Sequence, residues 1–105
     1  MSRKVLIGKK TVKRFNTRGK TVGTTAVQLS TDSSALEGGV QITADAGNSG
    51  TVYLGSRSNL TAGSSDETDG YPLAAGDSIL LPVDSEATIY LVGSGAGQKV
   101  YYLSF

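Results

Sequence analysis

From residue 25 to the last residue, apolar side chains alternate with polar ones in short runs, and this period of two decides the fold class. The alternating apolar positions are Val27 and Leu29; Val40, Ile42 and Ala44; Val52 and Leu54; Ile79, Leu81 and Val83; Ile89 and Leu91; and Tyr101, Leu103 and Phe105. Runs of this kind, separated by clusters of Gly, Asn, Asp and Ser, are typical of strands with one buried face. No period of 3.6 is sustained between residues 21 and 105. We therefore predict an all-β fold, a small antiparallel β-sandwich or barrel of about six to seven strands.

The length of 105 residues is that of one domain. We divide it into an N-terminal arm, residues 1–20, and a β-sandwich domain, residues 21–105. A body of this size buries only roughly 60–65% of the surface of its unfolded chain, so its core supplies modest stability. Packing against copies of itself or against a larger assembly would add to that stability, and we expect a homo-oligomer.

The charges divide at the same boundary. Eight of the ten Lys and Arg residues lie in residues 1–20, and all nine acidic residues lie between Asp32 and Glu86. The arm therefore carries a charge of +8, whereas residues 21–105, with two bases and nine acids, carry −7. Such asymmetry predicts a basic segment that meets an anionic partner, attached to a body with another role.

Apolar residues stand among the charges of the arm, among them Val5, Ile7, Val12 and Phe15. This mixture is more typical of a binding segment that orders on a partner than of a solubilising tail, which remains the alternative. The predicted partner-binding residues are Arg3, Lys4, Val5, Ile7, Lys9, Lys10, Lys13, Arg14 and Arg18. Val5 and Ile7 could add a strand to an exposed sheet edge, while the basic residues pair with carboxylates.

Composition excludes several kinds of catalytic site. The chain has no Cys and no His, which removes the usual zinc sites, the Ser-His-Asp triad and Cys nucleophiles. The acidic stretch Ser64–Gly70 does not match a calcium loop, because Ser65 stands where the first Asp is required and Gly76 where the Glu is required. The stretch Gly93–Lys99 lacks the Gly-Lys-Ser/Thr ending of a phosphate loop and is predicted to be a hairpin. We predict no catalytic residue, no metal and no cofactor.

Other polar and aromatic residues are interpreted as structural. The acids Asp32, Glu37, Asp77, Asp84 and Glu86 stand beside Ser and Gly at strand ends, where turn capping and solubility explain them. The tyrosines Tyr90, Tyr101 and Tyr102 are assigned to core and interface packing rather than to stacking on bases. The polar stretch 55–72 is expected to form a long loop at one end of the sandwich. A glycan-binding surface on this loop stays open as an alternative.

The N-terminus resembles a secretory signal only briefly. Arg3 and Lys4 precede Val5-Leu6-Ile7, but the apolar run then ends at Gly8, short of the roughly 7–15 residues that a signal requires. No stretch approaches the ~20 apolar residues of a membrane span. We expect a soluble chain without a membrane partner.

Residues 25–105 resemble small structural proteins that tailed bacteriophages encode among their virion genes. The resemblance is carried by Thr25–Leu29, Gly39–Asp45, Asn48–Gly55, Gly70–Val83, Ile89–Ser94 and Ala96–Leu103, which follow in the same order. In such proteins these segments are successive strands of a compact β-sandwich that decorates or cements the capsid. The resemblance covers about three quarters of the chain and includes neither the basic arm nor the loop at 55–69.

The resemblance implies a non-enzymatic virion protein, assembled in the host cytoplasm, whose partner is the major capsid protein or another virion protein. Together with the basic arm it predicts a capsid decoration or cement protein that stabilises the head by bridging shell subunits. A neck or tail component of the virion is one alternative. A nucleic-acid-binding protein that uses the basic arm is the other. A carbohydrate-active enzyme is the weakest reading, because the sequence offers no aromatic platform and no acid pair.

Overall fold

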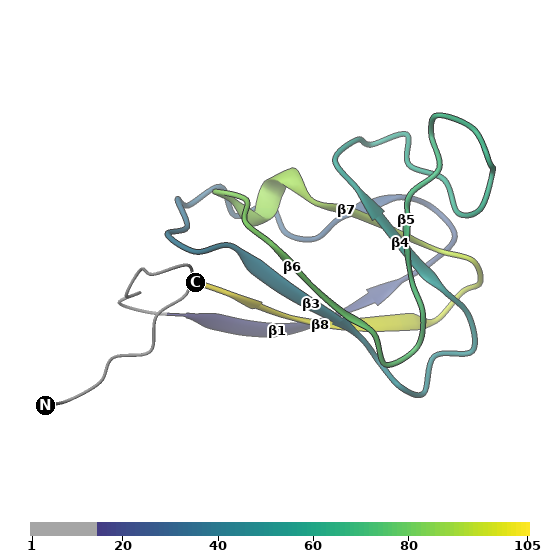
Figure 1. Cartoon of the computed structure of the whole chain (residues 1–105), viewed down its shortest axis with the longest axis horizontal. Coiled ribbons are helices and arrows are strands. Elements are labelled where there is room, and N and C mark those ends of the chain that lie inside the picture. Colours follow the sequence, from purple (N-terminus) through teal and green to yellow (C-terminus); the bar gives the residue numbers. More distant parts are fainter. Residues whose placement is uncertain (1–14) are drawn as a thin grey trace, which may run out of the picture.

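The computed structural model describes residues 15–105, which form two four-stranded antiparallel sheets packed face to face (Figure 1). The strands are β1 (Asn16–Val22), β2 (Val27–Gln28), β3 (Val40–Ala44), β4 (Val52–Gly55), β5 (Tyr71–Leu73), β6 (Ser78–Leu81), β7 (Tyr90–Gly93) and β8 (Gln98–Ser104). One short 3-10 helix, η1 (Glu86–Thr88), precedes β7. The prediction of an all-β antiparallel fold is confirmed, with eight strands in the described residues instead of six to seven.

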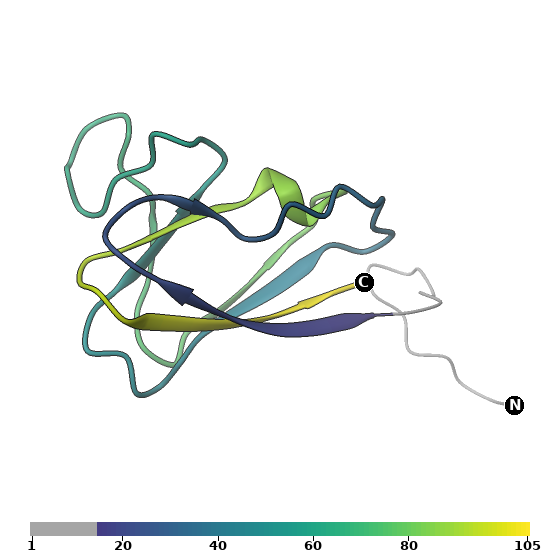
Figure 2. The same ribbon diagram turned by 180° about the vertical axis from the view of Figure 1, so that it is seen from behind.

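One sheet has the strand order β1-β8-β3-β6 and the other β2-β7-β4-β5. Among the strands of residues 15–105, only β4 and β5 follow one another within a sheet, so the other connections between these strands cross the sandwich from one sheet to the other. The glycine-rich stretch Gly93–Gly97 is one of these crossings, from β7 to β8, and the prediction of a hairpin there is wrong. Figure 2 shows β1 and β8 side by side along one face of the molecule.

The core lies between the sheets and uses the inward half of each alternating run. It is made by Val22, Leu29, Val40, Ile42, Ala44, Val52, Leu54, Leu73, Ile89, Leu91, Val100 and Tyr102. Val27, Leu36, Ile79, Leu81 and Val83 are only partly buried and pack at its margins. The strand period of two therefore identifies the buried face correctly for β3, β4 and β7.

The buried face of β8 differs from the prediction. Val100, Tyr102 and Ser104 point inward, whereas Tyr101 and Leu103 lie on the outer face of the sheet. Tyr101 is 45% exposed, with the Lys99 ammonium 5.1 Å from its ring centroid. Both faces of this strand carry apolar residues, so periodicity alone could not decide between them.

Gln98, at the start of β8, ties two of the inter-sheet turns together. Its side-chain carbonyl accepts a hydrogen bond from the Gly50 N–H at 2.9 Å, and its amide donates to Ser49 and to the Ala96 carbonyl. The side chain is 1% exposed, so these bonds satisfy a polar group inside the sandwich. They hold the β3–β4 turn against the β7–β8 turn.

Candidate interaction surfaces

Most of the predicted partner-binding residues precede the described part of the chain. Arg3, Lys4, Val5, Ile7, Lys9, Lys10, Lys13 and Arg14 lie outside residues 15–105, and Arg18 lies inside. Residues 16–20, which the sequence assigns to the arm, form most of β1 and pair antiparallel with β8. The last part of the predicted arm is therefore a strand of the sandwich, and the basic segment before it leads directly into a sheet edge.

That edge is polar. In β1, Arg18 and Lys20 lie on the same face as the buried Val22, because the side-chain period of a strand is two. At this edge of the sheet neither charged side chain is fully buried: Arg18 is exposed and Lys20 is partly buried. Charged residues on the inward face of an edge strand are a known means of preventing further strands from adding to it.

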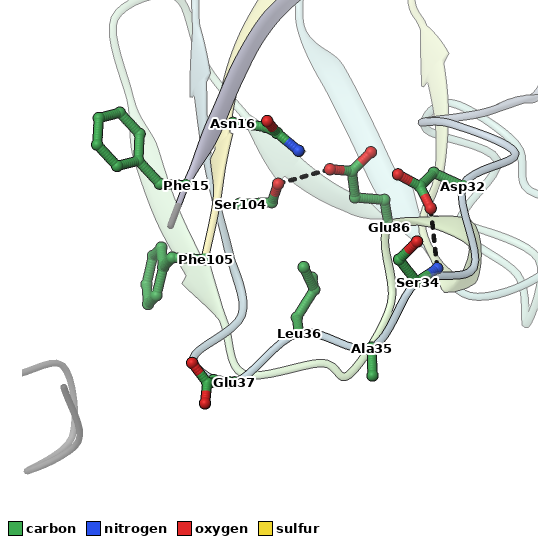
Figure 3. A pocket seen from close by; sticks show the side chains of 10 residues that line it. All are labelled: Phe15, Asn16, Asp32, Ser34, Ala35, Leu36, Glu37, Glu86, Ser104 and Phe105. Atoms are coloured by element: carbon green, nitrogen blue, oxygen red, sulfur yellow. Dashed lines mark hydrogen bonds between the residues drawn. The ribbon is translucent and has the colours of Figure 1, made fainter. Parts of the chain in front are cut away.

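A small acidic pocket lies beneath the start of β1 (Figure 3). Its volume is about 70 Å³, and its lining includes the carboxylates of Asp32, Glu37 and Glu86. Glu86 is 5% exposed and accepts a hydrogen bond from the Ser104 hydroxyl at 2.5 Å. Asn16 and Asp32 flank Glu86 in the close view. The interpretation of Glu86 as a residue that serves turn capping and solubility missed its burial, which follows from its place in η1.

The ionisation of Tyr102, on β8, is changed by its burial and by nearby charges, including that of Glu86. Burial raises the pKa of the Tyr102 hydroxyl above its ordinary range, and the negative charge of Glu86 adds to the rise. The positive charge of Arg18 and a hydrogen bond with Ser30 act in the opposite direction. Tyr102, Glu86 and Arg18 thus form one electrostatic unit under the β1 edge.

The long loop between β4 and β5 is held by its own side chains. Asp66 accepts hydrogen bonds from Thr68, through both its N–H and its hydroxyl, and from the Ser64 hydroxyl, and these bonds lower the pKa of its carboxyl. Asp69 accepts from the N–H groups of Gly63 and Ser65, at 2.7 and 3.0 Å. Two of the loop carboxylates that suggested a calcium site, Asp66 and Asp69, are thus bonded to loop donors. No group of three or more acidic side chains in residues 15–105 is arranged to hold a metal ion.

The tyrosines that could have formed a stacking platform are separated by the fold. Tyr102 points into the core, Tyr101 points out from the same strand, and Tyr90 lies in the opposite sheet. Tyr102 therefore packs in the core, whereas interface packing by Tyr101 stays a prediction. Loop residue Leu60, by contrast, is buried and lies against Gly55 and Gly70, so the loop covers part of the outer face of its sheet.

An apolar groove of about 430 Å³ lies between β5 and β6, at the side of the sandwich away from the edge strand β1. It is lined by Leu54, Gly55, Ser56, Tyr71, Ile79, Leu81, Val83, Thr88 and Ile89. Ile79, Leu81 and Val83 are the partly buried residues at the core margin, and Tyr71 is 59% exposed. No sequence pattern indicated this groove. The alternation of apolar and polar residues predicts which face of a strand is buried, but it does not predict where the two sheets leave a groove between them.

Comparison of the chain with protein-family models, with curated proteins and with solved structures found no match. None of the described segments forms a helix long and apolar enough to span a membrane. The geometry of the sandwich and the distribution of charge along the chain therefore support the proposed function.

Proposed function

We propose that this chain is a non-enzymatic structural protein of a phage virion, a capsid decoration or cement protein that stabilises the head by bridging shell subunits. The observation that carries the proposal is the separation of charge between the N-terminal segment and the sandwich. Residues 1–14 contain six bases and no acid, a charge of +6, whereas residues 15–105 contain four bases and nine acids, a charge of −5. The positive segment enters the sandwich at the exposed edge strand β1.

This arrangement suits a bridging protein. The sandwich is a compact body displayed on a surface, and the segment before β1 is the part that reaches a neighbour. Fourteen extended residues span at most ~50 Å, which is enough to contact an adjacent subunit. Each charged contact is weak, but repetition around a shell strengthens the whole by multivalency.

The location of the protein in purified particles tests this proposal. Heads and tails from the virus that encodes the chain would be separated and analysed by quantitative mass spectrometry. We expect the protein in the head fraction, in a fixed ratio to the major capsid protein. Its presence only in the tail or neck fraction would instead support the alternative that it is a component of those structures.

The contribution of the basic segment is tested by deletion. Removal of residues 1–14 keeps the whole of β1, whereas removal of residues 1–20 would also take five of its seven residues. We expect the full chain to bind shells that lack it and to protect them from heat or chaotrope. The variant without residues 1–14 should bind at least tenfold more weakly. Equal binding by both would rule out the bridging role of the segment.

Nucleic-acid binding is the second candidate, since the charge of +6 is followed by the exposed Arg18 on β1. If six charges contact phosphates of a duplex, the logarithm of the binding constant should fall with the logarithm of salt at a slope of about −5. Titration of labelled duplex DNA at several salt concentrations measures this slope. A flat response, or no binding at low salt, excludes this candidate.

A further inference from the structure

The sandwich has four strand edges, and they differ in their readiness to accept another strand. The edge strand β2 has only two residues, and the edge strand β5 contains Pro72, which has no N–H to donate. The edge strand β1 carries the inward-facing charges of Arg18 and Lys20. The edge strand β6, Ser78-Ile79-Leu80-Leu81, has none of these protections, so among the described strands it is the edge suited to pairing.

The apolar groove runs beside this open edge. Ile79 and Leu81 point toward the groove and are only half-buried, while Leu80 points outward and is 49% exposed. A strand added to β6 would extend the sheet over the groove. Its alternate side chains would then cover Ile79 and Leu81 on one face and Leu80 on the other.

The charges around β6 indicate which segment could be the added strand. Asp77 precedes β6 and Asp84 follows it, both exposed and seven positions apart. In the N-terminal segment, Val5-Leu6-Ile7 is preceded by Arg3-Lys4 and followed, after Gly8, by Lys9-Lys10. Three apolar residues with bases on both sides therefore match an apolar edge strand with an acid on both sides.

We infer that the β6 edge and the apolar groove bind residues 3–10 of a second copy of this chain as an added strand. The inference rests on the proposed function for the role of residues 1–14 as a binding segment, and it names their partner. Each copy thus offers one segment and one edge. Reciprocal exchange gives a closed dimer, and exchange in one direction gives a ring.

The pattern of side chains selects one register. With Leu6 opposite Leu80 in an antiparallel pair, both leucines lie on the outer face of the sheet. Val5 then lies opposite Leu81 and Ile7 opposite Ile79, and all four side chains face the groove. The same register places Lys9 opposite Asp77 and Arg3 and Lys4 beside Asp84. Cross-strand pairs of these kinds, apolar with apolar and base with acid, are the favourable ones.

The direction of the chain favours a second copy over the chain's own edge. Asn16 lies opposite Ser104, Ser104 opposite Val40, and Val40 opposite Leu81, so β1 starts at the end of the sheet where β6 finishes. A segment that ran straight from its own β6 edge into β1 would pair parallel with β6. All six strand pairings in the sandwich are antiparallel. A segment from another copy meets no such constraint and can pair in the antiparallel direction.

Disulfide trapping tests the register, since the chain has no native cysteine. A full-length Leu6→Cys chain would be mixed with a full-length Leu80→Cys chain under mild oxidation. We expect disulfide-linked heterodimers, at least tenfold more abundant than from Leu6→Cys mixed with Tyr101→Cys. Tyr101 provides the matched control because it is similarly exposed on the outer face of the same sheet. Equal yields from the two mixtures would overturn the inference.

Charge reversal tests the flanking pairs by sedimentation of the full chain. The wild type should sediment as a discrete oligomer, and Asp77→Lys with Asp84→Lys should weaken its association about tenfold. Adding Lys4→Glu and Lys9→Glu to the same chain should restore the association to within about threefold. The control variant Asp45→Lys with Glu67→Lys, which changes the net charge equally at other sites, should leave it unchanged. An association that the reversal leaves unaltered would contradict the inference.

The outcomes separate this inference from the proposed function. A monomeric chain that still binds shells through residues 1–14 overturns the exchange between copies and leaves the bridging role intact. An oligomer that shows the 6–80 disulfide but is absent from purified virions supports the exchange and refutes the virion role. A chain with both Leu6→Cys and Leu80→Cys that forms only an intrachain disulfide also overturns the inference, since its segment then covers its own edge.

Discussion

The two edge strands of the sheet β1-β8-β3-β6 differ in whether charged residues protect them from pairing with a further strand. The edge strand β1 is seven residues long and polar, and its inward face carries Arg18 and Lys20. The edge strand β6 has four residues, is apolar except for Ser78, and borders a groove. One edge is thus protected by its own charges, and the other keeps its acids outside the strand, at Asp77 and Asp84.

The difference shows that the distribution of charge along the chain is related to which edge strand can accept a further strand. Arg18 and Lys20 lie within β1, where they discourage pairing, and Asp77 and Asp84 flank β6, where they favour a basic strand. A neutral overall composition, with a formal charge of +1, conceals this polarity. If the two edges do differ in this way, changes at β1 should affect folding, and changes at β6 should affect association.

The largest expected effect is on the fold and comes from shortening β1. Deletion of residues 1–20 removes Asn16–Lys20, uncovers β8, and exposes Tyr102 and the buried Glu86. We expect this variant to lose cooperative urea unfolding, followed by circular dichroism. Deletion of residues 1–14 is the control and should unfold cooperatively. Equal midpoints for the two variants would show that β1 contributes little to the sandwich.

The attachment of β6 to β3 depends on Gly39, and its substitution gives the next largest effect. Gly39 has φ +137°, and an added Cβ would lie 2.3 Å from the Leu81 carbonyl oxygen and 2.9 Å from the Pro82 Cα. Both the backbone conformation and the clash with backbone atoms penalise Gly39→Ala. We expect a loss of about 3 kcal/mol in the free energy of unfolding, measured in urea.

Gly23→Ala is the control for this substitution, because no atom lies within 4 Å of the added Cβ. It should change the free energy of unfolding by no more than about 0.5 kcal/mol. A Gly39→Ala variant as stable as this control would mean that the chain at Leu81 and Pro82 moves away from the added Cβ without cost, and that Gly39 does not fix the end of β6 against β3.

The fold class could be predicted from sequence because alternation reports directly on half-buried strands. It succeeded for Val40, Ile42 and Ala44 in β3, where one face is apolar and the other polar. It failed for β8, where Tyr101 and Leu103 compete with Val100 and Tyr102, and only the packed sheet decides between the two sets. It also overlooked β1, whose sequence Asn-Thr-Arg-Gly-Lys-Thr-Val has one apolar residue and reads as part of a charged arm.

The interaction surfaces were less accessible to sequence reasoning. The charge division indicated a binding segment, but the open edge at β6 follows from strand order, which periodicity does not encode. The burial of Glu86 depends on η1 and on the Ser104 hydroxyl, 18 residues further along the chain. Both features arise from contacts between segments far apart in sequence, so no local pattern indicates them.

A smaller effect concerns the pH dependence of the protected edge. The pKa of Tyr102 is raised by burial and by Glu86, so folding favours its neutral hydroxyl. The resulting stabilisation is fully present below the unfolded-state pKa of about 10 and is lost as pH rises through the higher folded-state pKa. Tyr102→Phe cannot ionise, so its free energy of unfolding should fall less steeply above pH 10 than that of the wild type.

At neutral pH the same substitution should cost about 1 kcal/mol, because the hydroxyl no longer bonds with Glu86 and Ser30. Urea unfolding at a series of pH values measures both effects. Tyr71→Phe is the control, since it removes a tyrosine hydroxyl from an exposed position. Identical slopes for Tyr102→Phe and the wild type above pH 10 would contradict the electrostatic unit described for this edge.

The smallest effect comes from Arg18 and separates its two roles at the β1 edge. The positive charge of Arg18 lowers the pKa of Tyr102 against the larger effects of burial and Glu86, so Arg18→Gln should raise that pKa further. The titration would be followed by near-ultraviolet absorbance, with Tyr102→Phe variants subtracted to isolate one of the five tyrosines. Because Arg18 is exposed, the added rise should shrink in high salt. Arg18→Gln could instead leave the titration of Tyr102 unchanged but promote aggregation. In that case the charge of Arg18 only prevents further strands from pairing with β1, and it has no electrostatic effect on Tyr102.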